Sequence, residues 1–194
     1  PQAPSIAASR MAITCGVGIN NAIASGVNML GDVHGGAGEQ ALVLYQEILG
    51  GCSDRSLDEA IDQSLDALAA RAIKFVPGFG HRFHRPEDPR AQPLMELLRG
   101  CSQDDQSIDS RFADVAERIQ DAIEQRKGKR IAMNIDGATA AIYGALGVPA
   151  TLARGLFCLS RSVGLTAHAY EQSLSNERNK GPTPPDYRWT YDPK

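Results

Sequence analysis

The sequence lacks the features of a membrane-spanning, disulfide-stabilised or zinc-binding protein. Its four cysteines are scattered without a close pair, so neither a disulfide framework nor a zinc knuckle is indicated and a reducing cytoplasm fits best. The apolar stretch over residues 13–30 is interrupted by glycines and asparagines and has no basic flank, which favours a buried helix over a signal peptide or membrane span. We therefore expect a cytoplasmic protein that does not contact a membrane.

Strong charge, repeats and strand patterns are absent as well. A formal net charge of -3 argues against a nucleic acid held by bulk electrostatics. The 194 residues, 42% of them hydrophobic, suffice for one sizeable core or two small ones. No internal repeat, low-complexity segment or useful β-alternation occurs, so the predicted fold class is all-α. The chain begins at Pro1 without an initiator methionine, and we expect a further segment upstream.

Helical patterns fill most of the chain. Residues 4–28 are rich in small side chains at intervals of three and four, which predicts one or two closely packed helices and a broad contact of the kind that joins subunits. The polar, proline-rich tail from Ser175 is expected to wrap a surface or a neighbour. Further helices are predicted over residues 40–49, from a Ser56 cap to about Ile73, over 89–99 with Gly100 ending the helix, over 109–125, from about 136, and over 149–172.

Residues 76–90 form the stretch around which the chain is organised. Two glycines precede a histidine and several arginines follow it, with prolines that forbid a continuous helix. The glycines let the backbone approach a ligand and turn its N–H groups inward, the arginines can pair with phosphate or carboxylate, and the histidine can carry a proton near neutral pH. A solvated basic loop is the alternative. The residues are Gly78, Gly80, His81, Arg82, Arg85 and Arg90.

Three more residues are candidates for chemistry. His34 lies in a glycine-rich break before a helix, where the helix dipole keeps the ring neutral as a donor; a structural histidine is the alternative. Asp136 is a lone acid in an apolar segment and suits proton transfer, although it could simply cap the following helix. Arg161 lies in an apolar helix and is expected to have an anionic partner. Close metal-ligand spacing is missing between His34 and His81, so no metal is predicted.

Taken together, these stretches resemble one family. Residues 30–37, 78–81 with 88–90, and 134–137 resemble, in order and spacing, the three active-site segments of the citrate synthase superfamily, and residues 160–171 resemble its penultimate helix. The resemblance implies a multi-helical fold with a large helical domain and a smaller inserted one. Residues 1–194 would form a catalytic region without its N-terminal part, and residues 53–148 the small subdomain with the coenzyme A loop.

Within the superfamily the chain looks more like citryl-CoA lyase and the lyase domain of ATP-citrate lyase. The resemblance then implies carbon–carbon bond chemistry between a thioester and a 2-keto acid. In cleavage, His81 would accept the citryl hydroxyl proton as oxaloacetate forms. His34 would hydrogen-bond the thioester oxygen and stabilise the acetyl-CoA enolate, and Asp136 would protonate its carbon. Condensation reverses each role.

The same resemblance assigns binding residues and a homodimer or higher homo-oligomer. Relatives also carry a histidine just before the stretch where this chain begins, and His84 is expected to be incidental. Coenzyme A enters as the thioester substrate, and no metal or redox cofactor is implied. The carboxylate clamps would be Arg90 and Arg161, with Arg178 or Lys180 reaching the neighbouring subunit, and coenzyme A would contact Gly78, Gly80, Arg85 and Lys129.

Three functions stay open at this point. The first is cleavage of citryl-CoA to acetyl-CoA and oxaloacetate. The second is condensation of an acyl-CoA with oxaloacetate, as in citrate synthase or 2-methylcitrate synthase, by the same residues. The third is a catalytically silent module that binds coenzyme A or serves in assembly.

Overall fold

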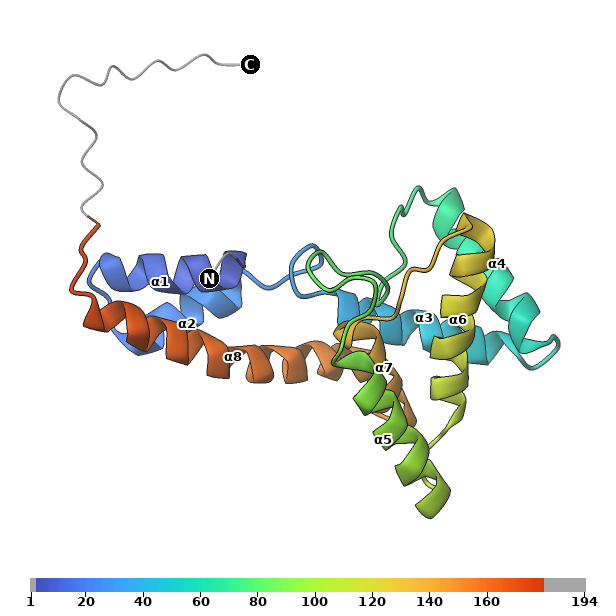
Figure 1. Ribbon diagram of the computed structural model, residues 1–194. Helices are drawn as coiled ribbons and strands as arrows, with labels where there is room; N and C mark the ends of the chain where they lie inside the picture. The colour runs from blue at the N-terminus through green and yellow to red at the C-terminus, as the bar shows by residue number, and fades with distance from the viewer. Residues whose placement is uncertain (1–2, 180–194) are drawn as a thin grey trace, which may run out of the picture. The chain divides into compact units, whose positions relative to one another are not determined.

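The structure, a computed structural model, describes residues 3–179 (Figure 1). Over this range the all-α prediction is confirmed, and none of the helices is both long and apolar enough to span a bilayer. Lys180 lies outside the described residues. The eight described helices are α1 (Pro4–Thr14), α2 (Ile19–Asn28), α3 (Ala37–Gly51), α4 (Leu57–Ala70), α5 (Ala91–Asp104), α6 (Arg111–Lys127), α7 (Ile135–Ala145) and α8 (Ala150–Leu174).

Local signals explain several helix ends. Ser56 begins α4 with the predicted capping box, since its hydroxyl accepts from the Glu59 amide and the Glu59 carboxylate accepts from the Ser56 amide. Gly128 ends α6 in the left-handed conformation, with φ of 62°. The predicted end of α5 at Gly100 is wrong, because the helix continues to Asp104. A single glycine costs a helix only about 1 kcal/mol relative to alanine and need not end it.

The described residues divide into two compact units. The first comprises residues 3–29 and 161–179, that is α1, α2 and the later part of α8. Here α1 packs against α2, and Gly26 lies so close to Leu165 that a β-carbon would be 2.8 Å from a Leu165 methyl carbon and 2.9 Å from the Ser5 carbonyl oxygen. The predicted close packing of small residues is thus confirmed for this unit.

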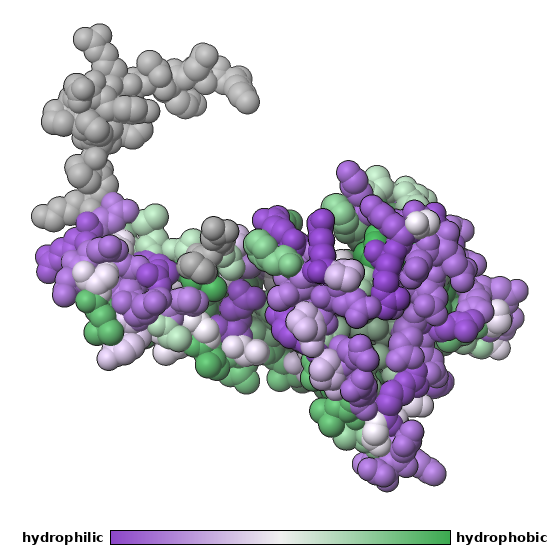
Figure 2. Space-filling view, in the orientation of Figure 1, coloured by the Kyte–Doolittle hydropathy of each residue, from purple (hydrophilic) through white to green (hydrophobic). Residues whose placement is uncertain are grey.

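The second unit comprises residues 30–160, that is α3 to α7 and the beginning of α8. Its core lies between α3 and the helices packed on it, α4, α6 and α7, while α5 packs against α7 and α6. On the exposed side, arginines of α6 pair with aspartates of α4, and this region is largely hydrophilic in Figure 2. The predicted subdomain, residues 53–148, falls within this unit and stays a prediction. The largest fully buried side chains of this core are Tyr45, Leu42, Ile48, Ile61, Ile119 and Val115.

Candidate active site

The glycine loop is joined to the segment that leads into α7. The backbone amide of Asn134 donates to the Gly78 carbonyl at 2.9 Å, and its side-chain amide donates to the Gly80 carbonyl at 2.6 Å. In return, the Gly80 amide donates to the Ala132 carbonyl at 2.8 Å. The expectation that the glycine N–H groups face a ligand therefore does not hold for Gly80 in this conformation. The loop is instead a fixed partner of α7.

Asn134 also settles how α7 begins. Its side-chain oxygen accepts from the amides of Asp136 at 2.9 Å and Gly137 at 3.2 Å, so Asn134 is the N-cap. Asp136 is a half-buried residue of the first turn. The alternative in which Asp136 caps the helix is wrong, because a residue two positions earlier already bonds the first amides. Its carboxyl group is thus not needed for capping.

Asp88 connects the basic loop to the same helix start. Its side chain is completely buried and accepts from Arg90 Nε at 2.8 Å, Arg90 Nη2 at 2.7 Å and the Ile135 amide at 3.1 Å. The Arg90 guanidinium holds the pKa of the Asp88 carboxyl far below its usual range. From the sequence Asp88 was only part of a motif. The structure makes it the group that orients Arg90 and fixes the loop to α7.

The His81 ring is held in one tautomer by its own loop. Its Nδ1 accepts from the amides of Phe83 at 3.1 Å and His84 at 3.0 Å, so the neutral ring carries its hydrogen on Nε2. Burial lowers the pKa of His81 and His84 lowers it further, while Asp88 and, less strongly, Asp136 oppose this shift. The His84 ring centroid lies 4.5 Å from that of His81, and the expectation that His84 is incidental stays a prediction. Neutral His81 therefore offers a donor at Nε2.

This tautomer conflicts with the proton-acceptor role that the resemblance implies for His81 in cleavage. To take a proton at Nε2, the neutral ring would need its hydrogen on Nδ1, where it could no longer accept from the two loop amides. In this conformation His81 is a hydrogen-bond donor to a substrate oxygen. The proton-acceptor role stays a prediction that requires both amide bonds to break.

His34 lies in the turn that precedes α3, whose N-cap is Gly36. The His34 carbonyl accepts from the Gly31 amide at 2.8 Å, and the residue is half-buried. One turn later, a β-carbon on Gly38 would lie 4.0 Å from a carboxyl oxygen of Asp136. The packing of α3 on α7 therefore brings the turn with His34 and the first turn of α7 to the same end of this helix pair.

The predicted coenzyme A cations are exposed at the edge of the second unit. Arg85 Nε makes a long contact of 3.5 Å to the His81 carbonyl, and its side chain is open to solvent. Lys129 is exposed just after α6. Its neighbour Arg130 pairs with Glu87 at 2.7 Å, which ties this end of α6 to the basic loop.

The other two predicted clamps belong to the first unit. Arg161 Nη1 donates to the Ser5 hydroxyl at 3.3 Å, so this arginine joins α8 to α1. Arg178 is exposed beyond the end of α8. Their assignment to substrate carboxylates stays a prediction.

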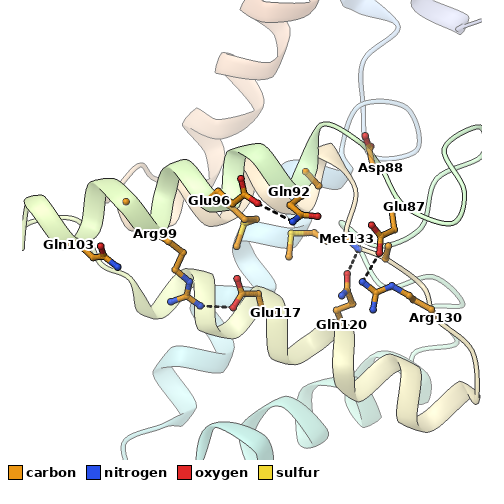
Figure 3. Close-up of a pocket in the computed structure, with 14 residues that line it drawn as sticks. Glu87, Asp88, Gln92, Glu96, Arg99, Gln103, Glu117, Gln120, Arg130 and Met133 are labelled. Carbon is orange, nitrogen blue, oxygen red and sulfur yellow. Dashed lines mark hydrogen bonds and ion pairs between the residues drawn. The ribbon is translucent and has the colours of Figure 1, made fainter.

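A cavity of about 510 Å³ lies between α5 and α6 and was not anticipated from the sequence (Figure 3). Two methionines line it together with several paired charges, among them Arg99 with Glu117 and Arg130 with Glu87. None of the predicted site residues lines it. Its connection to the candidate site is Asp88, which contributes to its wall.

Comparison with known proteins identifies the family. The model of the citrate synthase C-terminal domain matches residues 2–183. The chain belongs to the citrate synthase family. The resemblance inferred from the motifs is confirmed, and the fold is that of the family.

The individual relatives include both citrate synthases and a citryl-CoA lyase. Citrate/2-methylcitrate synthase from Bacillus subtilis is 31% identical over 159 residues, which is 81% of this chain and 39% of that protein. Citryl-CoA lyase from Hydrogenobacter thermophilus is 32% identical, with a TM-score of 0.77 over 98% of this chain and 71% of that chain. Citrate synthase from Thermoplasma acidophilum, solved as a ternary complex with carboxymethyl coenzyme A and oxaloacetate, is 25% identical, with a TM-score of 0.74 over 98% of this chain and 49% of that one. The chain spans 36–39% of the length of curated synthases that it matches.

Proposed function

We propose that this protein cleaves citryl-CoA into acetyl-CoA and oxaloacetate. The observation that carries the proposal is the attachment of the 76–90 loop to the beginning of α7. This loop holds His81 neutral and holds Arg90 against Asp88, and Asp88 bonds the first turn of α7, which contains Asp136. The bond to Asp88 is the main cause of the raised pKa of Arg90, to which Asp136 adds, and burial is the main cause of the lowered pKa of His81, which Asp136 opposes. The likeness to a citryl-CoA lyase at 32% identity supports the lyase direction.

Each residue then has a chemical role. His81 accepts the proton of the citryl hydroxyl at Nε2 once its ring hydrogen has moved to Nδ1 and the two loop amides have been released, so the hydroxyl carbon becomes the ketone of oxaloacetate as the carbon–carbon bond breaks. His34 donates to the thioester oxygen and stabilises the enolate of acetyl-CoA. Asp136, which starts the step as the acid, delivers its proton to the enolate carbon.

Binding is assigned to the arginines and the loop. Arg90 presents its remaining N–H groups to a substrate carboxylate, because Nε and Nη2 are bonded to Asp88. Arg161 and Arg178 are proposed for the other carboxylates. Coenzyme A is proposed to lie on Arg85, Gly78, Gly80 and Lys129. A homodimer and a cytoplasmic location belong to the same proposal.

Condensation is the second candidate. It is favoured by the 31% identity to a citrate/2-methylcitrate synthase and needs no other residues. Asp136 would then act as the base that removes a proton from the acetyl methyl group. The two directions share one transition state, so only rates can separate them.

The test compares both directions in the full-length protein. Oxaloacetate release from citryl-CoA is followed by coupling to malate dehydrogenase, and thiol release from acetyl-CoA plus oxaloacetate is followed in parallel. Rapid cleavage with weak condensation supports the lyase, and faster condensation moves the protein to the synthases. Silence in both assays with retained coenzyme A binding would favour the non-catalytic module.

Asp136→Asn tests the residue assignment. We expect the faster reaction to lose about 10²–10⁴-fold in kcat, the range for a general acid or base. Asp114→Asn is the matched control, because Asp114 lies in the first turn of α6, where it pairs with Arg99 and with none of the candidate site residues that the structure describes. Full activity of Asp136→Asn would remove Asp136 from the mechanism in either direction.

A further inference from the structure

We infer, on the basis of the proposed function, that Arg154 of α8 is a positioning residue for His34, which it holds through Asp32 and Glu39. No motif pointed to Arg154, which lies in the apolar first half of the longest helix. Its two partners lie on either side of His34 in the chain, Asp32 two residues before and Glu39 five residues after.

The contacts form a bridge from α8 to the His34 turn. Arg154 Nη2 pairs with Asp32 Oδ1 at 2.6 Å, and Arg154 Nε pairs with the Glu39 carboxylate in the first turn of α3. One planar guanidinium therefore contacts both the beginning of the turn and the helix that follows it. The two contacts use different nitrogens of one rigid planar group, which a lysine ammonium does not provide.

The two contacts of Arg154, with Glu39 and with Asp32, differ in how far they are buried. The Glu39 side chain is 19% exposed and that of Arg154 29% exposed, whereas that of Asp32 is 78% exposed. The contact with Glu39 is thus the partly desolvated and stronger one. The contact with Asp32 lies at the surface and mainly orients the guanidinium. The hydrogen bond from Arg154 to Asp32 raises the pKa of the guanidinium, so Arg154 keeps its charge.

The turn is compact enough to transmit this constraint to His34. The Gly31 amide bonds the His34 carbonyl at 2.8 Å, and Gln40 Nε2 donates to the Asp32 carbonyl at 3.1 Å. A β-carbon on Gly36 would lie 2.7 Å from that same Asp32 oxygen. With so little space inside the turn, a displacement of Asp32 has to move His34.

A second contact from α8 supports the same turn. Gly35 has φ of +93°, and a β-carbon there would lie 2.8 Å from the Phe157 ring. Phe157 and Arg154 are three residues apart and so lie on one face of α8. The helix therefore supports the His34 turn twice, once by an apolar ring and once by charge.

A purely structural ion pair is the competing explanation, and Arg126 supplies the comparison. Arg126 also bridges two carboxylates, Asp62 and Asp66, with a similar side-chain exposure of 33%. Both of its partners lie on α4, 28 and 32 residues along the chain from His34. Loss of Arg126 removes the same kind of bridge without touching His34.

The deciding measurement is made on His34 itself. Full-length protein labelled with ¹³C at histidine Cε1 is titrated by NMR as wild type, Arg154→Met and Arg126→Met, and His34→Gln identifies the His34 resonance. We expect Arg154→Met to move the His34 resonance and its titration midpoint while those of His168 stay in place. Arg126→Met should move neither. An unchanged His34 resonance in Arg154→Met overturns the inference, whatever the activity.

A selective change in kcat is a second readout, which a purely structural role of Arg154 would not produce. If the protein cleaves citryl-CoA, Arg154→Met should lower kcat by about 10- to 100-fold with KM changed less than threefold, since a displaced group costs about that much. Arg154→Lys should stay nearer to Arg154→Met than to wild type, because an ammonium cannot bridge both carboxylates in one plane. Wild-type kcat in a folded Arg154→Met protein counts against the positioning role. Silence of the wild type in both assays would instead refute the proposed function and leave the NMR result to decide the inference.

Discussion

Gly78 and Gly137 lie so close together that the backbone of each fills the space that a β-carbon on the other would need. A β-carbon on Gly78 would be 2.8 Å from Gly137 Cα, and one on Gly137 would be 2.5 Å from the Gly78 carbonyl oxygen. This approach lets Asn134 bond the loop and cap α7 at once. The candidate catalytic groups on the loop and on α7 are therefore held by backbone packing.

Gly78→Ala should consequently destabilise the protein by more than its backbone conformation alone demands. Gly147 is the control, since its φ of +70° resembles the +85° of Gly78 but a β-carbon there meets nothing within 4 Å. We expect Gly147→Ala to cost about 1 kcal/mol for the left-handed conformation and Gly78→Ala about 1–3 kcal/mol more for the collision. Urea unfolding measures both, and equal costs would contradict the close approach.

Asp88→Asn should be far more damaging than a similar change in a similar motif. Asp109 pairs with Arg111 two residues later, as Asp88 does with Arg90, but its side chain is 30% exposed, whereas that of Asp88 is 0% exposed. We expect Asp88→Asn to lose about 2–4 kcal/mol of unfolding free energy because the buried bonds to Arg90 and Ile135 are broken. Asp109→Asn should lose less than about 1 kcal/mol. Comparable losses would mean that burial of Asp88 is not what matters.

Much of the fold follows from local signals in the sequence. The Ser56 capping box and the apolar spacing of the α6 residues predicted helices that the structure contains. Gly100 misled because a single glycine costs a helix only about 1 kcal/mol, and α5 continues to Asp104 although its last buried residue is Leu98. Family motifs located the candidate site, but they could not give its geometry.

What the sequence could not provide is the tertiary pairing around each motif. Asp136 was the obvious capping acid, and only the loop geometry places Asn134 at the cap. Similarly, the His81 tautomer depends on two amides within the folded loop, and Arg154 meets its partners across more than a hundred residues. These contacts arise from packing, which no local pattern encodes.

The rate of the reaction should fall at low pH because His81 becomes protonated. Burial lowers the pKa of His81, so the group stays neutral until the pH falls below its ordinary value of about 6.5. Protonation then puts a hydrogen on Nδ1 and breaks the bonds from the Phe83 and His84 amides. We expect kcat/KM to decline with falling pH through a midpoint below about 6.5, which a pH–rate profile measures.

His84→Gln distinguishes His81 from any other group that titrates there. The charge of His84 lowers the pKa of His81, so its removal should move the acid midpoint upward while the backbone amide at position 84 is kept. His168→Gln is the control, since His168 faces Glu171 in the first unit. A midpoint that does not move in His84→Gln would assign the acid limb to another residue.

Arg85→Ala should weaken coenzyme A binding through its phosphates. Charge-assisted hydrogen bonds of this kind contribute about 1.5–3 kcal/mol, so we expect Kd to rise roughly 10- to 100-fold by calorimetry. Arg71→Ala is the control, because Arg71 is an exposed arginine at the end of α4, outside the loop. The difference should shrink at high salt, where exposed charges are screened.

A substrate fragment separates a phosphate contact from a general effect on the loop. Acetyl-pantetheine carries the thioester but no phosphate, so Arg85→Ala and wild type should bind it equally if Arg85 contacts phosphate. Equal losses for coenzyme A and the fragment would mean that the substitution disturbs the loop, through the contact of Arg85 with the His81 carbonyl. A difference confined to coenzyme A would place a phosphate at Arg85.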